Sequence, residues 1–155
     1  MSAVLKSAPA ALRPMTDTDL DDVLAIEQRG YEFPWSRTIF EDCLRVGYCC
    51  WVLEWDRSTV GYAVMSVAAG EAHILNLCVD PALQRKGLGR FLLDHLLDLA
   101  LSHRATMMFL EVRPSNLAAQ RLYEGASFNE VGVRHNYYPA RVAREDAIIM
   151  ARQLS

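Results

Sequence analysis

Residues 79–93 read V-D-P-A-L-Q-R-K-G-L-G-R-F-L-L and join an apolar run to a helical pattern. Asp80-Pro81 ends the apolar run of residues 72–79, and from Leu88 onward apolar residues recur at helical spacing. The turn at 84–89 is basic, and its glycines let the backbone approach a ligand closely. The first N–H groups of a helix, aided by the helix dipole, form an anion site. The stretch therefore predicts a strand, an anion-binding turn and a helix, with pyrophosphate as the expected ligand.

Two better-known glycine-rich loops do not fit this turn. A P-loop requires G-x-x-x-x-G-K-[S/T], whereas Gly89 is followed by Arg90-Phe91 and no hydroxyl is offered to magnesium. A dinucleotide fingerprint requires glycine or alanine at its third position, where this chain has Leu92. Taken by itself, the loop leaves one plainer alternative, which is a turn followed by a basic helix start.

The totals indicate an ordinary globular chain. Its 155 residues predict a single domain at 11–155, preceded by a loose tail at 1–10 that is rich in Ala, Ser and Pro. The net charge of −3 does not favour nucleic-acid binding. No apolar stretch approaches the roughly 20 residues of a membrane span, and the first residues do not resemble a signal peptide. We expect a cytoplasmic protein that contacts neither membrane nor nucleic acid, with a monomer favoured.

The cysteines and histidines show no metal-binding or disulfide pattern. The 4 cysteines contain no C-x-x-C pair, so we expect buried thiols in a reducing compartment. The 4 histidines, His73, His95, His103 and His135, show no ligand spacing, so no metal site is expected.

The remaining patterns predict alternating strands and helices. Strands are expected at 11–15, 48–55, 59–69, 72–79, 107–112, 129–137 and 146–152. A first helix is expected after a cap at Thr16 or Asp17 and ends at Gly30, and further helices are expected at 38–45, from 88 to about 104 and at 117–125. The long helix should bury Leu92, Leu93, Leu96, Leu97, Ala100 and Leu101. The predicted fold class is mixed α/β (α+β): a central, mostly antiparallel twisted sheet with one parallel β-α-β unit and flanking helices.

Two segments carry a resemblance to a known superfamily. V-D-P-x-x-Q-R-x-G-x-G at 79–89 resembles the acetyl-CoA loop of the GNAT acetyltransferases. N-L-A-A-Q-R-L-Y-E-G-A-S-F at 116–128 resembles the N-x-x-A-x-x-L-Y-x-x-x-G-F segment of the same superfamily. Their order and separation match, and the likeness runs from about Leu12 to Leu154. It implies a GNAT-like single domain that uses acetyl-CoA as co-substrate.

Further segments resemble a narrower family, the bacterial ribosomal-protein-alanine N-acetyltransferases. They are P-W-S at 34–36, F-L-E-V-R at 109–113, R-H-N-Y-Y-P at 134–139 and R-E-D-A-I-I-M at 144–150. This likeness implies acetylation of the N-terminal α-amine of alanine on a ribosomal small-subunit protein. The alternatives are a GNAT enzyme for a small amine or lysine, and a non-catalytic regulatory module that binds acetyl-CoA.

Ser127 departs from the superfamily segment, which usually has glycine at that position. A glycine there often closes a helix in the left-handed conformation. We expect Gly125 to take over that role two residues earlier.

The resemblance also implies which residues hold the co-substrate. The backbone of Leu77, Cys78 and Val79 would pair with the pantetheine arm as an added strand, and the N–H groups from Arg85 through Arg90 would take the pyrophosphate. The full set is Leu77, Cys78, Val79, Arg85, Lys86, Gly87, Leu88, Gly89, Arg90 and Asn116. The side chains of Arg85 and Lys86 serve either the adenosine-end phosphate or only solvent. Cys78 suggests a covalent acyl-cysteine route, but its apolar surroundings favour a buried thiol and direct transfer.

Glu111 is the candidate general base. Alternation along the strand places its side chain opposite those of Leu110 and Val112. An α-amine has a pKa of about 7.7–8.0, so much of it is protonated at neutral pH and a carboxylate can collect that proton. The pattern alone leaves a solvated glutamate paired with Arg113 equally open, and the resemblance favours the base.

Tyr123 is the candidate general acid that protonates the departing thiolate. The helical spacing of Ala119, Leu122 and Ala126 around it indicates a core aromatic, whereas the resemblance of L-Y-x-x-x-(G/S)-F favours the functional role. The loops at 33–36 and 136–139 are expected either to line the peptide groove or simply to anchor the chain.

Overall fold

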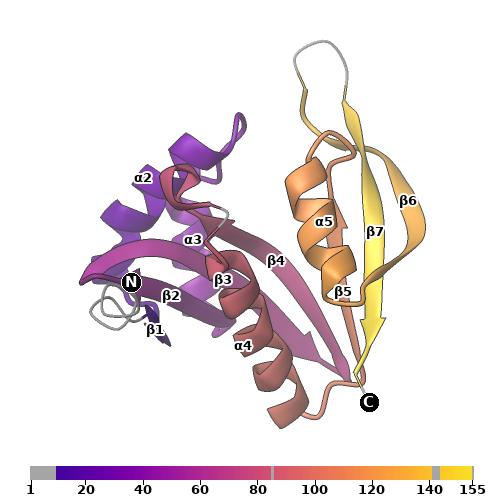
Figure 1. Ribbon diagram of the computed structural model, residues 1–155, viewed down its shortest axis with the longest axis horizontal. Coiled ribbons are helices and arrows are strands. Elements are labelled where there is room, and N and C mark those ends of the chain that lie inside the picture. The colour runs from indigo at the N-terminus through magenta and orange to yellow at the C-terminus, as the bar shows by residue number, and fades with distance from the viewer. Residues whose placement is uncertain (1–9, 85, 141–143, 155) are drawn as a thin grey trace. The chain divides into compact units, whose positions relative to one another are not determined.

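The computed structural model describes residues 10–84, 86–140 and 144–154, which fall into two compact units. Unit 1 comprises Met1–Met65 and Asn76–Leu93, and unit 2 comprises Ser66–Leu75 and Asp94–Ser155. The boundary between the units passes through strands β3 and β4 and helix α4. These elements are labelled in Figure 1. The expected tail lies outside the described residues except for Ala10, which begins the first strand.

The strands form a 7-stranded sheet in the order β1-β2-β3-β4-β5-β7-β6. The recorded pairings are antiparallel for β1–β2, β2–β3, β5–β7 and β6–β7, and parallel for β4–β5. The prediction of a mostly antiparallel sheet with one parallel β-α-β unit is therefore confirmed. The strands are β1 Ala10–Pro14, β2 Cys49–Trp55, β3 Ser58–Ala68, β4 Glu71–Val79, β5 Met107–Val112, β6 Asn129–Tyr138 and β7 Glu145–Gln153.

The helices also match the predicted types, with shifted ends. They are α2 Leu20–Gly30, α3 Arg37–Arg45, α4 Leu88–Ser102 and α5 Leu117–Gly125, with the short 3-10 turns η1 Asp17–Asp19 and η2 Pro81–Leu83. Helix α4 buries its predicted face through Ala100, but Leu101 is 44% exposed, so that part of the prediction is wrong. Leu101 lies in the last turn of the helix, and helical spacing does not indicate how far along a helix its neighbours extend.

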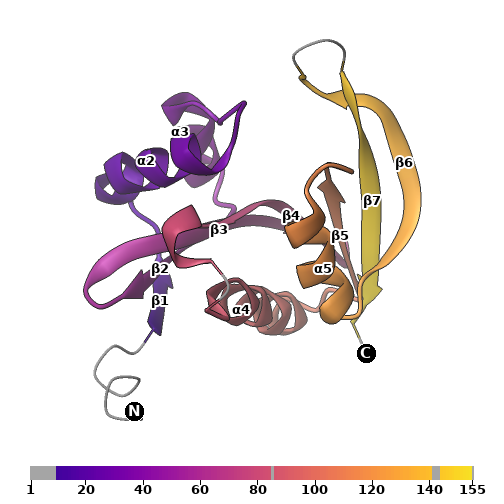
Figure 2. The same ribbon diagram turned by 45° about the horizontal axis from the view of Figure 1, so that its top comes forward.

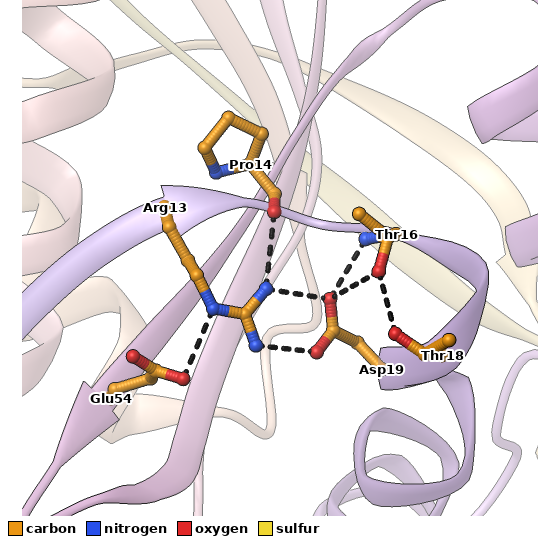
Figure 3. Close-up of polar contacts among 6 residues, drawn as sticks. All are labelled: Arg13, Pro14, Thr16, Thr18, Asp19 and Glu54. Atoms are coloured by element: carbon orange, nitrogen blue, oxygen red, sulfur yellow. Dashed lines mark hydrogen bonds and ion pairs between the residues drawn. The ribbon is translucent and has the colours of Figure 1, made fainter.

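In unit 1, an arginine fastens β1 to its neighbours (Figure 3). The Arg13 guanidinium donates to both carboxylate oxygens of Asp19, at 2.9 and 2.6 Å, and to Glu54 Oε2 at 3.0 Å. The Thr16 N–H also donates to Asp19, at 2.8 Å. The hydrogen bond from Arg13 is the main reason that the pKa of Asp19 lies below its usual range. This cluster ties β1 to η1 and to β2.

In unit 2, helix α5 lies beside β5 and β7 (Figures 1 and 2) and ends in a Schellman motif. The Phe128 N–H donates to the Tyr123 carbonyl and the Ser127 N–H to the Glu124 carbonyl, both at 3.0 Å. Ser127 is the left-handed residue of this motif, with φ of 70°. Gly125 is still helical, so the expectation that it would take this role is wrong. The two closing hydrogen bonds place the left-handed residue at Ser127, even though its side chain disfavours that conformation.

Candidate active site

The end of β4, in unit 1, contains the residues expected to meet the pantetheine arm. The β4–β5 register runs from Glu71↔Met107 to Ile74↔Leu110, and residues 75–79 lie beyond it. The Tyr31 hydroxyl donates to the Leu77 carbonyl at 3.0 Å. Gly61 lies so close that an added Cβ would be 2.8 Å from the Cys78 carbonyl oxygen. This end of β4 is therefore tightly held, and its main chain extends past the ladder with β5.

Cys78 is buried, as predicted, and burial raises the pKa of its thiol to about 11. A thiol with a raised pKa is a poor nucleophile at neutral pH, which disfavours an acyl-cysteine route. Cys43 and Cys50 are also buried, whereas Cys49 is only half-buried.

A buried carboxylate supports the same end of β4. Glu27 is 1% exposed and accepts hydrogen bonds from the Tyr62 hydroxyl, from Asn76 Nδ2 at 3.0 Å and from the Trp35 N–H at 2.9 Å. Burial is the main reason that the pKa of Tyr62 is raised. The network joins α2, the loop at 34–36, β3 and β4. It was not foreseen, because its members lie far apart in the sequence.

The glycine turn precedes the start of α4, as predicted. Gly87 adopts φ of 77°, a conformation that favours glycine, and Leu88 begins the helix. The Phe91 N–H donates to the Gly87 carbonyl at 3.0 Å, which is the first hydrogen bond of the helix. The N–H groups of residues 88–90 come before it and therefore have no acceptor within the helix. The Leu88 side chain packs into the core with Leu53, Val60 and Val79, so this residue offers a ligand only its main-chain N–H. Arg85 lies outside the described residues, and Lys86 is exposed.

Glu111, in unit 2, lines a cavity of about 360 Å³. Its side chain is 9% exposed, and Oε1 lies 2.7 Å from Nε2 of His73, whose side chain is 33% exposed. Arg113, the predicted alternative partner, forms its recorded ion pair with Glu145 at 3.0 Å. The lining residues of the cavity are Ser66, Ala68, Glu71, Ala72, His73, Phe109, Glu111, Arg134 and Ile149. Glu111 is thus a nearly buried carboxylate with a histidine partner.

Tyr123 and Asn116 are both held by α5. Tyr123 is 6% exposed, and its ring centroid lies 5.6 Å from that of Phe128, the apolar contact that accompanies a Schellman motif. Asn116 caps the helix through Oδ1, which accepts from the Ala119 N–H at 3.1 Å. The cap engages the oxygen of the amide and leaves its NH₂ group as the part suited to donate to a ligand.

Tyr138 lies within electrostatic reach of both candidate proton-transfer residues. Burial is the largest cause of its raised pKa, and Tyr137, Glu111 and Tyr123 add to it. The Arg113 guanidinium stacks 4.4 Å from the centre of its ring. From the sequence, Tyr138 was expected either to line the peptide groove or to anchor its loop.

Among the described residues, no group of three or more His, Cys, Asp or Glu side chains is arranged to hold a metal ion. Within the same residues, none of the helices is long and apolar enough to cross a membrane.

Comparison with known proteins identifies the family. The model of the acetyltransferase (GNAT) family matches residues 19–128. The chain is 44% identical to the [ribosomal protein bS18]-alanine N-acetyltransferase of Escherichia coli K12, over 89% of this chain and 93% of that protein.

Solved structures agree with this assignment. The crystal structure of the Escherichia coli ribosomal-protein-S18-alanine N-acetyltransferase superposes with a TM-score of 0.88, at 41% identity and 95% coverage of each chain. A Salmonella typhimurium protein solved with its cofactor acetyl-CoA shares the fold, with a TM-score of 0.77, 22% identity and 95% coverage of each chain. This chain belongs to the acetyltransferase (GNAT) family.

Proposed function

We propose that the protein transfers the acetyl group of acetyl-CoA directly to the α-amine of an N-terminal alanine on a ribosomal small-subunit protein. The observation that carries the proposal is Glu111, a nearly buried carboxylate that lines a cavity. It is supported by the 44% identity of the chain to the [ribosomal protein bS18]-alanine N-acetyltransferase of Escherichia coli. A ribosomal acceptor would place the reaction in the cytoplasm.

The residues of unit 1 suit the donor. When bound, acetyl-CoA supplies an activated acetyl thioester. The main chain of residues 77–79 is extended and continues past the β5 ladder, which suits pairing with an elongated ligand arm. The turn at Gly87 and the first N–H groups of α4 suit a pyrophosphate, with Lys86 and Arg90 nearby in sequence. Asn116, which belongs to unit 2, is assigned a further donor role through its amide NH₂ group.

The residues of unit 2 suit proton transfer. Glu111 would attract the protonated amine and collect its proton, directly or through water, because amines attack only in the neutral form. Tyr123 would give its hydroxyl proton to the departing thiolate, and the contact with Phe128 fixes where that ring lies. The polarisation of the thioester carbonyl is assigned to unit 1, to a backbone N–H at the end of β4.

The cavity around Glu111 also suits a small first residue. Ala68, Ala72 and Ile149 give it apolar walls beside the carboxylate. A small side chain such as that of alanine can be covered by such walls while its amine meets Glu111. A lysine side chain or a polyamine would present its amine on a long flexible stem, and this acceptor class is the alternative.

The test is acetylation of synthetic peptides, followed by mass spectrometry. One peptide begins with alanine and has a free N-terminus. Its matched control has the same sequence with a blocked N-terminus and carries a lysine. We expect acetylation of the first alone. Reaction only with the lysine peptide or with small polyamines would replace the proposed acceptor. Binding of acetyl-CoA without turnover on any amine would indicate a regulatory module.

A further inference from the structure

In the described part of the structure, the Glu111 side chain has one hydrogen-bond partner, which is His73. The two residues come from β4 and β5, which pair in parallel with His73 opposite Phe109. The histidine is the more exposed partner, at 33% against 9% for the glutamate side chain. A proton on Glu111 therefore lies next to a titratable group that reaches further toward solvent.

We propose that His73 is a positioning and proton-relay residue that acts through Glu111, an inference that rests on the proposed function. In the resting pair, the Nε2–H of His73 donates to Glu111 Oε1 and fixes the carboxylate in the cavity. During turnover Glu111 takes the proton that the amine loses as its nitrogen bonds to the acetyl carbon. The neutral imidazole exchanges its proton with solvent so that Nδ1 carries it, and the freed Nε2 then accepts the proton of Glu111. The resulting imidazolium gives its Nδ1 proton to water, which restores the Nε2–H form of the ring. The carboxylate is regenerated, and one proton has reached solvent.

Charged groups of both signs line the cavity beside the pair. Besides Glu111, the charged lining residues are Glu71 of β4 and Arg134 of β6, while β3 contributes Ser66 and β7 contributes Ile149. Glu71 lies on the same face of β4 as His73, because side chains alternate along a strand. Its carboxylate favours a transient positive charge on the imidazole, and Arg134 opposes it. Histidine is the side chain type best matched to relaying protons near neutral pH.

Two substitutions separate the relay from simple support of the carboxylate. In His73→Gln, the amide can still donate a hydrogen bond to Glu111 but cannot take up and release a proton. In His73→Ala, the ring is removed and space is left for a small buffer molecule. His103→Gln is the matched control, because His103 is exposed and the hydrogen bonds described for its ring go to Leu99 and Ser102 at the end of α4.

We expect His73→Gln to lower kcat for the alanine peptide about tenfold, less than the roughly 10²–10⁴-fold that removal of a general base costs. Added imidazole should restore His73→Ala toward the wild-type kcat, more strongly as the pH rises and the neutral base accumulates. His103→Gln should turn over like the wild type with or without imidazole. The KM for acetyl-CoA should be unchanged in all variants.

Wild-type kcat in His73→Gln, or no rescue of His73→Ala by imidazole, would overturn the relay. A rescue that equally improves the wild type and His103→Gln would also overturn it. These results differ from failure of the proposed function itself, in which the wild-type protein would acetylate no alanine peptide.

Discussion

At the scale of single residues, Glu111 decides whether the acceptor loses its proton. Glu111→Gln should lower kcat/KM for the alanine peptide about 10²-fold at pH 7, because the amide cannot collect a proton. The loss should shrink at pH 9, where most α-amines, with a pKa of about 7.7–8.0, are already neutral. Steady-state kinetics across this pH range would test it.

The control for Glu111→Gln is Glu130→Gln, the same chemical change at an exposed position of β6. It should leave kcat/KM unchanged at both pH values. A Glu111→Gln defect of equal size at every pH would argue for a role in shaping the cavity rather than in proton transfer.

Tyr123 is the second residue proposed to transfer a proton, as the general acid. Tyr123→Phe keeps the ring against Phe128 and removes only the hydroxyl. We expect kcat to fall about 10²-fold, while the Kd for acetyl-CoA and the thermal unfolding temperature stay within error. Phe91→Tyr, which adds a hydroxyl at an exposed site on α4, serves as a control for tyrosine content. Turnover at the wild-type rate in Tyr123→Phe would remove this residue as the acid.

Ser127 carries backbone strain that glycine would relieve. Its φ of 70° disfavours any residue with a Cβ, at a cost of about 1–2 kcal/mol. Ser127→Gly removes that cost. It also gives the unfolded chain more conformational freedom, which destabilises the folded state by about 0.4–1 kcal/mol. We expect a net gain of about 0.5–1 kcal/mol in the free energy of unfolding, measured by urea denaturation. Ser127→Ala keeps the Cβ and should show no gain. A loss of stability in Ser127→Gly would mean that the hydroxyl makes a stabilising contact.

The sequence predicts well which way a side chain faces where strand alternation decides it. It predicts poorly which partner a side chain has where that depends on tertiary contacts. Alternation placed Glu111 on the face opposite Leu110, and the structure puts it in a cavity with a buried Leu110 behind it. His73 was missed, because its bond to Glu111 spans 38 positions and depends on the register of two strands. The predicted parallel pairing, combined with alternation on both strands, is the signal that could have found it.

At the scale of elements, the Arg13–Asp19 pair fastens the first strand. Asp19→Asn removes the charge that the two terminal nitrogens of the Arg13 guanidinium contact, at 2.9 and 2.6 Å. Hydrogen bonds to charged groups contribute about 1.5–3 kcal/mol, so we expect a loss of that order in the free energy of unfolding at pH 7. Asp21→Asn is the matched control, because the side chain of Asp21 is 87% exposed in its ion pair with Arg37. It should unfold like the wild type.

The same pair gives a dependence on pH with a definite sign. The pKa of Asp19 is lowered in the folded state, chiefly by Arg13, so its contribution is fully present above the unfolded value of about 3.9. That contribution is lost as the pH falls through the folded pKa. The stability difference between wild type and Asp19→Asn should therefore shrink below about pH 4. An equal difference at pH 7 and at pH 3 would show that the asparagine disturbs packing instead.

Element types followed from periodicity, whereas element ends did not. The strand–turn–helix at 79–93 was predicted because Asp80-Pro81 and the glycines interrupt two different periods. Helix α5 was expected to close at Gly125, yet it closes at Ser127. There the hydrogen bonds of the Schellman motif and the contact between Tyr123 and Phe128 outweigh the intrinsic preference for glycine.

At the scale of the whole molecule, the predicted donor and proton-transfer residues fall in different parts of the chain. Leu77–Val79 and the glycine turn belong to unit 1, and Glu111 and Tyr123 belong to unit 2. The mixed sheet with one parallel pair could be predicted from the order of the elements, because a strand, a helix and a further strand favour a right-handed parallel crossover. The acceptor could not be predicted from composition or periodicity, because specificity depends on the side chains that converge on the cavity.

Binding of acetyl-CoA should stabilise the whole chain against heat. A ligand that binds only the folded state adds about 2.7 kcal/mol at a concentration 100 times its Kd. For a chain of this length, that corresponds to a rise in Tm of about 5–11 °C. ATP and NAD at the same concentration are the matched ligands, because they carry phosphates but require the P-loop or dinucleotide motifs that the turn at 84–89 lacks. We expect smaller shifts with both, measured by differential scanning calorimetry. Equal stabilisation by all three ligands would indicate that the turn is a general anion site. The pantetheine arm would then add nothing to the binding free energy beyond what the phosphates supply.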